Sequence, residues 1–288
     1  MTGDPFLTHR SLLFTVAYEM LGAAADAEDV VQETWLRWAD VDQAEVRDPR
    51  AYLVRIVTRQ ALNRLRSVSR RREDYIGEWL PEPLVTRPDV AEDVELAENV
   101  SIAMLTVLET LGPAERAVFV LHEVFETPYD EIADVVGKTP AAVRQIAHRA
   151  RAHVAERRPR MRVDRAQQQA AVQTLMAAIS TGDVRGLIEV LAPDVVLITD
   201  GGGVARAARK PIAGAERVLA YVARAAREAP RIVTAPAWLN GMPGARIDID
   251  GEPTALSLVV EDGLITRIYA IRNPHKLHWL ATVADLRR

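Results

Sequence analysis

Two stretches of the sequence concentrate arginine and hold almost no acidic residues. Residues 47–72 carry nine arginines and one aspartate, and residues 138–162 carry eight basic residues and one acid. Guanidinium groups bind phosphate oxygens, and they can also bridge the hydrogen-bonding edge of guanine. Two separate basic stretches therefore indicate contacts with nucleic acid, although the net charge of the whole chain is −4.

The second basic stretch has the pattern of a helix-turn-helix. We expect a short helix over 129–136, a turn over 137–139, and a longer helix over 140–157 with Thr139 as its N-cap. Apolar residues at spacings of three and four should face inward: Val143, Ile146, Ala147 and Ala150. The polar residues between them suit major-groove reading: Arg144, Gln145, His148, Arg149 and Arg151.

The first basic stretch should form the last of three helices. Gly22 ends the first helix, Asp26 can cap the second, and Pro49 opens the third. On the second helix we expect the apolar residues to line one side: Val30, Val31, Trp35, Leu36 and Trp38. Three polar residues then lie elsewhere on its surface and can pair with a basic partner: Asp29, Gln32 and Glu33. A plain solvated face is the alternative reading of these three.

Residues 73–98 break the helical pattern. They hold three prolines and carry one basic residue and nine acids, a net charge of −8, so we expect a linker. Within it, residues 79–84 form an apolar cluster that includes Trp79, Leu80, Pro81 and Leu84. A loop lying on its own domain and a docking segment both stay open for this cluster.

The pattern after residue 164 indicates an α+β domain. Helices are expected over 165–180, 184–191 and 214–228. Strands are expected over 195–199, 232–239, 245–249, 254–260 and 264–271, with hairpin turns at 241–244 and 261–263. Helices followed by a meander of strands favour α+β over a doubly wound parallel sheet.

Composition excludes several functions. The chain has no cysteine, which removes disulfides and thiolate chemistry and fits a cytoplasmic location. No window has the length and apolar content of a membrane span, and the first ten residues do not resemble a secretory signal. The acids and histidines show no metal or catalytic-triad spacing, so we expect no cofactor and no enzyme activity.

The two basic modules, in this order, resemble extracytoplasmic-function (group 4) RNA polymerase sigma factors. Residues 26–38 resemble the family's polymerase-binding helix, 48–56 its −10 element helix and 142–151 its −35 reading helix. The resemblance implies binding to core RNA polymerase through Asp29, Gln32 and Glu33, and to double-stranded and melted promoter DNA. The implied −10 residues are Arg50, Tyr52, Arg55, Arg59, Asn63 and Arg66, and Thr139 joins the −35 set. Arg64 also suits phosphate, and the loop between residues 40 and 48 is the implied base pocket.

Alternatives stay open for these residues. Tyr52 is read more simply as core packing. For the arginines of the third helix, a solvated face is the alternative to phosphate binding. The family often has asparagine where Arg59 stands and aspartate where Asn63 stands, which blurs the expected promoter preference. The acidic linker would suit a positively lined polymerase channel, and a disordered spacer is its alternative.

The C-terminal domain resembles the SnoaL-like group of the NTF2-like cone domains. Three segments resemble the sigma factors that carry this extension: 79–84, 200–203 and 273–277. The residues expected to regulate between domains are Trp79, Leu80, Pro81, Leu84, Asp200, Gly201, Gly202, Gly203, Asn273 and Pro274. Regulation within the chain is favoured over sensing of a small molecule in the cone pocket, and over catalysis by residues such as Asp194, Asp248, Asp250, His275 and His278.

The predicted architecture is therefore multidomain. It comprises sigma domain 2 over 1–72, an acidic linker over 73–98, sigma domain 4 over 99–162 and the SnoaL-like domain over 163–288. The alternative, from a different class of protein, is an NTF2-like isomerase or cyclase fused to a DNA-binding module.

Overall fold

The chain forms two compact units, each described below by itself. The structure, a computed structural model, describes residues 4–72, 74–91, 93–158, 164–182, 185–229 and 231–287. Unit 1 comprises Met1–Glu73, Leu105–Arg157 and Asp285–Arg288, and unit 2 comprises Asp74–Met104 and Arg158–Ala284. This division groups the predicted linker with the C-terminal domain. The domain boundaries at residues 72, 98 and 162 remain predictions from the sequence.

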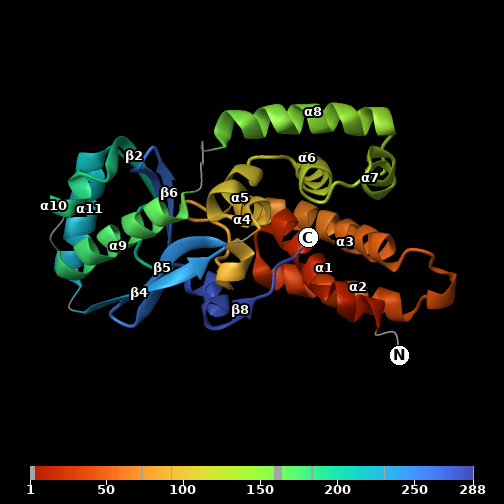
Figure 1. Ribbon diagram of the computed structural model, residues 1–288, viewed down its shortest axis with the longest axis horizontal. Helices are drawn as coiled ribbons and strands as arrows, with labels where there is room; N and C mark the ends of the chain where they lie inside the picture. The colour runs from red at the N-terminus through yellow and green to blue at the C-terminus, as the bar shows by residue number, and fades with distance from the viewer. Residues whose placement is uncertain are drawn as a thin grey trace. The chain divides into compact units, whose positions relative to one another are not determined.

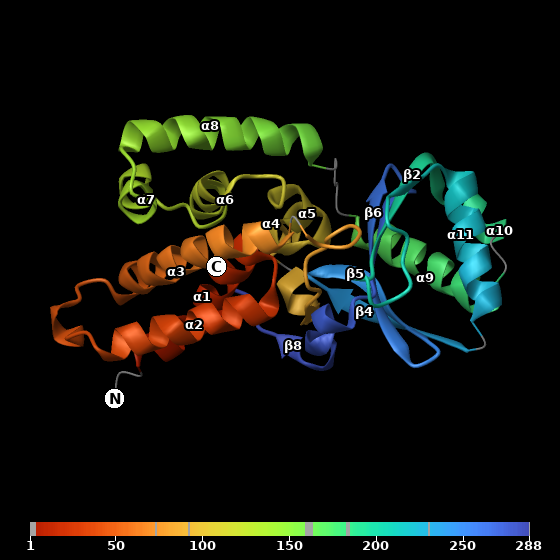
Figure 2. The same cartoon turned by 180° about the vertical axis from the view of Figure 1, so that it is seen from behind.

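Unit 1 is helical. Its first three helices pack side by side (Figure 2). They are α1 (Pro5–Leu21), α2 (Ala24–Ala39) and α3 (Pro49–Arg72), with a 3-10 turn at Gln43–Glu45 in the loop before α3. The helices that follow residue 105 are α6 (Pro113–Phe119), α7 (Tyr129–Val136) and α8 (Pro140–Arg157), with a π-helical turn at Val120–Val124. The three-helix bundle and the helix-turn-helix are both confirmed.

Local chemistry explains most of these helix ends. Gly22 adopts the left-handed conformation with φ of 63° and donates its N–H to the Tyr18 carbonyl, which ends α1. The Thr139 hydroxyl accepts the Ala142 N–H at 3.3 Å, as expected of an N-cap. The expected cap of α2 is wrong, because this helix begins at Ala24 and Asp26 lies inside its first turn.

Other helices are interrupted or short. Ser101 separates α4 (Val94–Val100) from α5 (Ile102–Leu108). The chain becomes π-helical after Phe119. The helix expected over 184–191 is only the short α10 (Arg185–Ile188) among the described residues.

The described residues of unit 2 form one eight-stranded sheet in the order β3-β2-β7-β6-β5-β4-β1-β8. The strands are β1 (Val85–Thr86), β2 (Leu191–Asp200), β3 (Ile212–Ala213), β4 (Ile232–Leu239), β5 (Met242–Ile249), β6 (Glu252–Glu261), β7 (Leu264–Ile271) and β8 (Val283–Ala284). Its longer helices are α9 (Arg165–Thr181) and α11 (Ala215–Glu228), and short 3-10 helices lie at Pro88–Ala91, Pro274–Lys276 and His278–Ala281. The α+β cone expected for this domain is confirmed.

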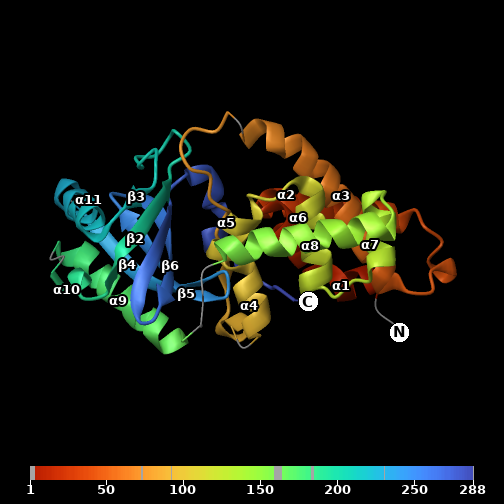
Figure 3. The same cartoon turned by 90° about the horizontal axis from the view of Figure 1, so that it is seen from above.

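The two faces of the sheet have separate apolar cores. Helices α9, α10 and α11 gather on one face (Figures 1 and 3), where Leu175 and Val218 pack against sheet residues such as Ile247. The opposite core contains Leu80 from the predicted linker and Ile102 from α5. The linker is therefore part of the folded C-terminal unit.

Two strand predictions need correction. The β4–β5 turn lies at Asn240 and Gly241, because Leu239 already pairs with Met242, so most of the expected 241–244 turn belongs to β5. The strand expected to begin at Val195 begins at Leu191 and contains a bulge before Val196. The turn expected at 261–263 lies between the paired residues Glu261 and Leu264.

Candidate functional site

Helix α8 presents a continuous polar face. Arg144, Gln145, His148 and Arg149 are exposed, whereas the apolar side of the helix is buried. Arg151 is also exposed, but its guanidinium donates to the Tyr129 hydroxyl at 2.9 Å and lies 3.4 Å from a Glu123 carboxylate oxygen. The first four side chains are thus available to read base edges, and Arg151 is already engaged.

Helix α3 places most of the expected −10 residues on the surface. Arg50, Arg55, Arg59, Asn63 and Arg66 are exposed. Tyr52 is half-buried, and its ring centroid lies 5.9 Å from that of Trp38, which agrees with the packing interpretation. The Arg55 guanidinium lies 5.1 Å from the centre of the Tyr52 ring. Arg64 does not project freely, because it pairs with Asp26 at 2.8 Å and also with Asp29.

Helix α2 exposes the three residues expected to bind polymerase. Asp29 pairs with Arg64, and the Glu33 carboxylate accepts a hydrogen bond from Gln60 at 3.0 Å. Gln32 lines a groove of about 460 Å³ beside Trp35 and Leu36. Trp35 and Leu36 do not share the buried side of the helix with the other apolar residues, since they are 46% and 59% exposed. This exposed apolar surface was missed because helical spacing alone does not show which side of a helix lacks a neighbour.

The three-helix bundle and the helix-turn-helix pack together inside unit 1. Helix α3 contacts α6 and α7, and the Arg59 guanidinium donates to the Asp134 carbonyl of α7 at 2.8 Å. A cleft of about 710 Å³ lies between the loop before α3 and the start of α7. Its lining includes Arg50, Tyr52 and Arg55 on one side and Glu131 on the other.

A buried arginine joins the same modules. Arg116 of α6 is 1% exposed, donates its Nε–H to the Glu19 carbonyl of α1 at 3.0 Å and pairs with Glu109. Burial lowers the pKa of the Arg116 guanidinium to about 9, a direction that desolvation of a cation produces. Arg116 was not among the residues expected at a functional site.

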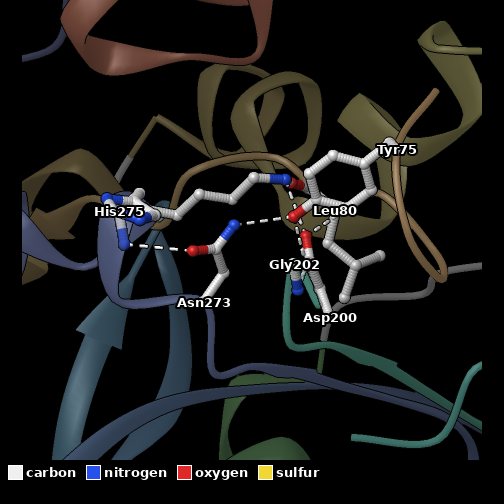
Figure 4. A network of polar contacts seen from close by, with 7 residues as sticks. Tyr75, Leu80, Asp200, Gly202, Asn273 and His275 are labelled. Atoms are coloured by element: carbon white, nitrogen blue, oxygen red, sulfur yellow. Dashed lines mark hydrogen bonds and ion pairs between the residues drawn. The ribbon is translucent and has the colours of Figure 1, made fainter. Parts of the chain in front are cut away.

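In unit 2, a network of polar contacts centred on Asp200 holds the linker (Figure 4). Asp200 is fully buried at the end of β2. One carboxylate oxygen accepts the Tyr75 hydroxyl at 2.6 Å and the Gly202 N–H at 3.0 Å. The other accepts the Leu80 N–H at 2.9 Å and the Lys276 ammonium at 2.6 Å. We call Tyr75, Leu80, Asp200, Asn273 and Lys276 the Asp200 network.

Two members of the Asp200 network were not among the expected site residues. Lys276 also donates to the Leu80 carbonyl at 2.6 Å and lies 3.9 Å from the centre of the Trp79 ring. The Tyr75 hydroxyl accepts the Asn273 amide at 2.7 Å. Burial, reinforced by the hydrogen bond to Asp200, raises the pKa of the Tyr75 phenol. A lone tyrosine and lysine gave no pattern that could reveal these contacts.

The glycines after Asp200 permit this close approach. A Cβ on Gly202 would lie 2.2 Å from the Asn273 amide nitrogen, and the residue has φ of 58°. A Cβ on Gly203 would lie 3.0 Å from Ile76. A side chain at either position would therefore collide with the linker or with the segment that holds it. Pro274, which was also expected to act between domains, is exposed and begins the 3-10 helix that contains Lys276.

A second contact holds the other end of the apolar cluster. The Asn240 side chain accepts the Leu84 N–H at 2.9 Å and donates to the Val100 carbonyl at 2.9 Å. Gly241 donates its N–H to the Thr86 hydroxyl at 3.0 Å. Strand β1 also pairs with β4 and β8, so the linker supplies a strand to the sheet. Pro81 and Leu84 are buried between these two contacts.

The C-terminal residues belong to unit 1. The Asp285 carboxylate accepts the Ser11 hydroxyl at 2.7 Å, and the Arg287 N–H donates to the Thr15 hydroxyl at 3.0 Å. Leu286 between them is 3% exposed. The chain that leaves β8 therefore ends on helix α1.

Candidate catalytic groups do not assemble among the described residues. They include no cluster of acids and histidines that could hold a metal ion. Asp248 accepts the Gly251 N–H and Asp250 accepts the Arg231 N–H, both beside the turn between β5 and β6. Across the same part of the chain, no helix has the length and apolar content to cross a membrane.

Comparison with known families defines the class of protein. Residues 6–71 match the family described as Sigma-70 region 2, and residues 101–154 match Sigma-70, region 4. These two matches cover the three-helix bundle and the helix-turn-helix, and together they define a sigma-70 type factor.

Relatives in Mycobacterium tuberculosis extend the match across the chain. The curated ECF RNA polymerase sigma factor SigJ is 37% identical over 96% of this chain and 93% of its own length. A second relative, ECF RNA polymerase sigma factor SigG, is 32% identical over 65% of this chain and 58% of its own length. The crystal structure of SigJ is 36% identical and has a TM-score of 0.77, with 94% of this chain and 96% of that chain covered. The chain belongs to the extracytoplasmic-function RNA polymerase sigma factors.

Proposed function

We propose that this protein binds core RNA polymerase and directs it to promoters, and that its C-terminal domain regulates this activity within the same chain. The exposed face of α8 supports reading of the −35 element, with Arg144, Gln145 and Arg149 on base edges. The arginines of α3 support binding at the −10 element. Family membership supports α2 as the polymerase-binding helix.

The Asp200 network carries the regulatory part of the proposal. The family is expected to thread its interdomain linker through polymerase, yet here Leu80 and Leu84 are fully buried in unit 2. Burial of each leucine stabilises the folded unit by about 1.5–3 kcal/mol. The buried ion pair between Asp200 and Lys276 also requires the two side chains to keep one geometry. One segment cannot occupy both places, so the C-terminal domain sequesters the linker in the free protein.

The tail gives the C-terminal domain a second connection to the sigma modules. Because Leu286 is buried in unit 1, the chain after β8 is fixed in that unit, and the chain also joins the two units between Arg157 and Arg158. The C-terminal domain is therefore tied to the sigma modules at both of its ends. Regulation by sequestration needs such ties, since they keep the binding domain close to its own linker.

Run-off transcription with purified core polymerase tests the proposed function. A template bearing a promoter selected from random sequence by the protein itself should yield a transcript that depends on added protein. A variant with alanine at Arg144, Gln145 and Arg149 should lose most of that transcript on the same template. An absence of protein-dependent transcription from any selected template would exclude a sigma-factor function.

A further inference from the structure

The C-terminal domain contains an apolar cavity, open on one side, that the sigma modules do not use. The cavity has a volume of about 80 Å³ and lies between the sheet and helices α9 and α11. Its apolar lining includes Leu175, Ile179, Leu197, Val222, Leu256 and Ile268. A dry cavity of this kind accommodates an apolar group more readily than water.

The cavity continues into a wider and more polar mouth. A neighbouring pocket of about 470 Å³ shares Tyr221, Ala225, Ile249 and Arg272 with it. The charged residues of the mouth include Arg206 and Arg224, which both pair with Glu228. Inner cavity and mouth together have the size of a small-molecule site.

Two buried polar atoms of the cavity lining have no hydrogen-bond partner among the described residues. One is the Thr254 hydroxyl oxygen, on a residue that is 3% exposed. The other is Nε of Arg272, whose side chain is 12% exposed. The remaining Arg272 nitrogens are used, because Nη1 donates to the Arg206 carbonyl at 2.6 Å and Nη2 to Glu252 at 3.3 Å. Buried polar atoms without partners are costly in a folded protein, so a missing partner is indicated.

Sheet register brings these two residues close together. Strands β6 and β7 pair Ala255 with Ile271 and Leu256 with Ala270. Continuing this antiparallel register by one residue sets Thr254 opposite Arg272. Side chains of opposed residues lie on the same face of a sheet with their Cβ atoms about 5 Å apart. Both side chains line the inner cavity, so its otherwise apolar wall carries a hydroxyl and a guanidinium group from neighbouring residues.

We propose that this cavity binds a small aliphatic carboxylic acid. One carboxylate oxygen accepts the Arg272 Nε–H, and the other accepts the Thr254 hydroxyl. The arginine favours an anion over a neutral acceptor, because hydrogen bonds between ionised partners are roughly twice as strong as neutral ones. The apolar end fills the inner cavity, which is roughly half the ~150 Å³ that holds a benzene ring, so a short chain fits better than an aromatic ring.

This inference goes beyond the proposed sigma-factor function, and its test does not use transcription. Butyrate, isovalerate and hexanoate are titrated into the full-length protein by calorimetry, each beside its uncharged primary amide. Benzoate serves as the ring-bearing comparison. We expect at least one short acid to bind, and its amide to bind about tenfold or more weakly.

Matched variants assign the binding to the cavity. Thr254→Val removes the hydroxyl at constant shape and should weaken acid binding about tenfold. Thr266→Val is the control, because the Thr266 hydroxyl is also buried without a partner among the described residues but does not line the cavity. Ala270→Leu should abolish binding by filling the inner cavity. Circular dichroism confirms that each variant is folded.

The possible results separate cleanly. Loss of binding in Thr254→Val and Ala270→Leu, with normal binding in Thr266→Val, supports the assignment. No acid binding at millimolar concentration, or equal binding by Thr254→Val and Thr266→Val, overturns it. Equal affinity for acids and their amides would contradict the carboxylate class. None of these results bears on whether the protein directs transcription.

Discussion

At the scale of single residues, Asp200 determines how the linker is held. Its two oxygens accept hydrogen bonds from Tyr75, Gly202, Leu80 and Lys276, so the buried carboxylate is fully partnered. Removing Lys276 would leave the Asp200 carboxylate without its counter-ion in a buried site, which typically costs about 3–5 kcal/mol. The network is therefore sensitive to any side chain that separates its members.

Gly202→Ala should loosen the linker. Its Cβ would lie 2.2 Å from the Asn273 amide, and such overpacking costs about 1–3 kcal/mol. Gly251→Ala is the matched control, because Gly251 has φ of 87° but no atom within 4 Å of its Cβ position. Hydrogen exchange at the Leu80 amide, which donates to Asp200, should be about tenfold faster in Gly202→Ala. Equal exchange in the two variants would show that the glycine is not needed for close approach.

The sequence could predict only some of these residues. Asp200, the glycines and the apolar cluster over 79–84 belong to segments that resemble the family. Lys276 belongs to such a segment too, over 273–277, whereas Tyr75 belongs to none. These two residues lie 76 and 125 residues from Asp200, and nothing local in the sequence marks either as its partner. The contact made by the Asn240 side chain was also missed. Asparagine is common in β-turns because it tolerates a positive φ, here 53°, so its residue type indicated no further role.

At the scale of elements, helix α8 carries the expected sequence specificity. Alanine at Arg144, Gln145 or Arg149 should cost about 1–3 kcal/mol of promoter binding and relax preference at one base position. Arg151 is engaged with Glu123 and Tyr129, so its loss should weaken all sequences alike. Fluorescence anisotropy with promoter and scrambled duplexes over a range of salt measures both effects. Arg157→Ala, at the helix end, is the control. Unchanged binding after all four substitutions would exclude α8 as the reading helix.

Helix α2 should carry polymerase binding. Glu33→Arg reverses an exposed charge and should weaken core binding about tenfold while the helices stay folded. Glu216→Arg on α11 makes the same charge change on an exposed residue of the C-terminal domain and should have little effect. Both affinities can be measured by surface plasmon resonance on immobilised core enzyme. Equal affinities would remove α2 from the interface.

The elements themselves were largely predictable where periodicity and caps agreed. Helices α7 and α8 and strands β4 and β7 have the predicted bounds, because glycine, proline and threonine mark their ends and apolar spacing fills them. Strands β1 and β8 were not predicted, since two-residue strands have no periodicity. Their pairing depends on residues from distant parts of the chain, and only the folded unit reveals it.

At the scale of the whole molecule, the proposed function predicts that the sigma modules separate when they bind a promoter. The −10 and −35 elements lie about 25 base pairs apart, or about 85 Å along the duplex. Helices α3 and α7 nevertheless touch within unit 1, through Arg59 and the Asp134 carbonyl. The contact is thus a property of the free protein, and α3 and α8 should move apart in the transcription complex.

Distance measurement between two labels tests this opening. The chain has no cysteine, so Ser67→Cys on α3 and Ala152→Cys on α8 can be labelled selectively at exposed positions. Energy transfer between the dyes should fall strongly when core polymerase and promoter DNA are added. Unchanged transfer in a complex that transcribes would contradict the requirement for separation.

The most direct test of the account compares run-off transcription by wild-type protein, Gly202→Asp and Gly251→Asp with purified core polymerase. All three proteins should support transcription from the same promoter, because neither glycine belongs to the DNA-binding or polymerase-binding helices. Gly202→Asp should change the transcript yield several-fold, since its side chain collides with Asn273 and releases the linker, while Gly251→Asp should match wild type. Equal yields from all three proteins would contradict regulation through the Asp200 network, and no transcript from any of them would contradict the sigma-factor function itself.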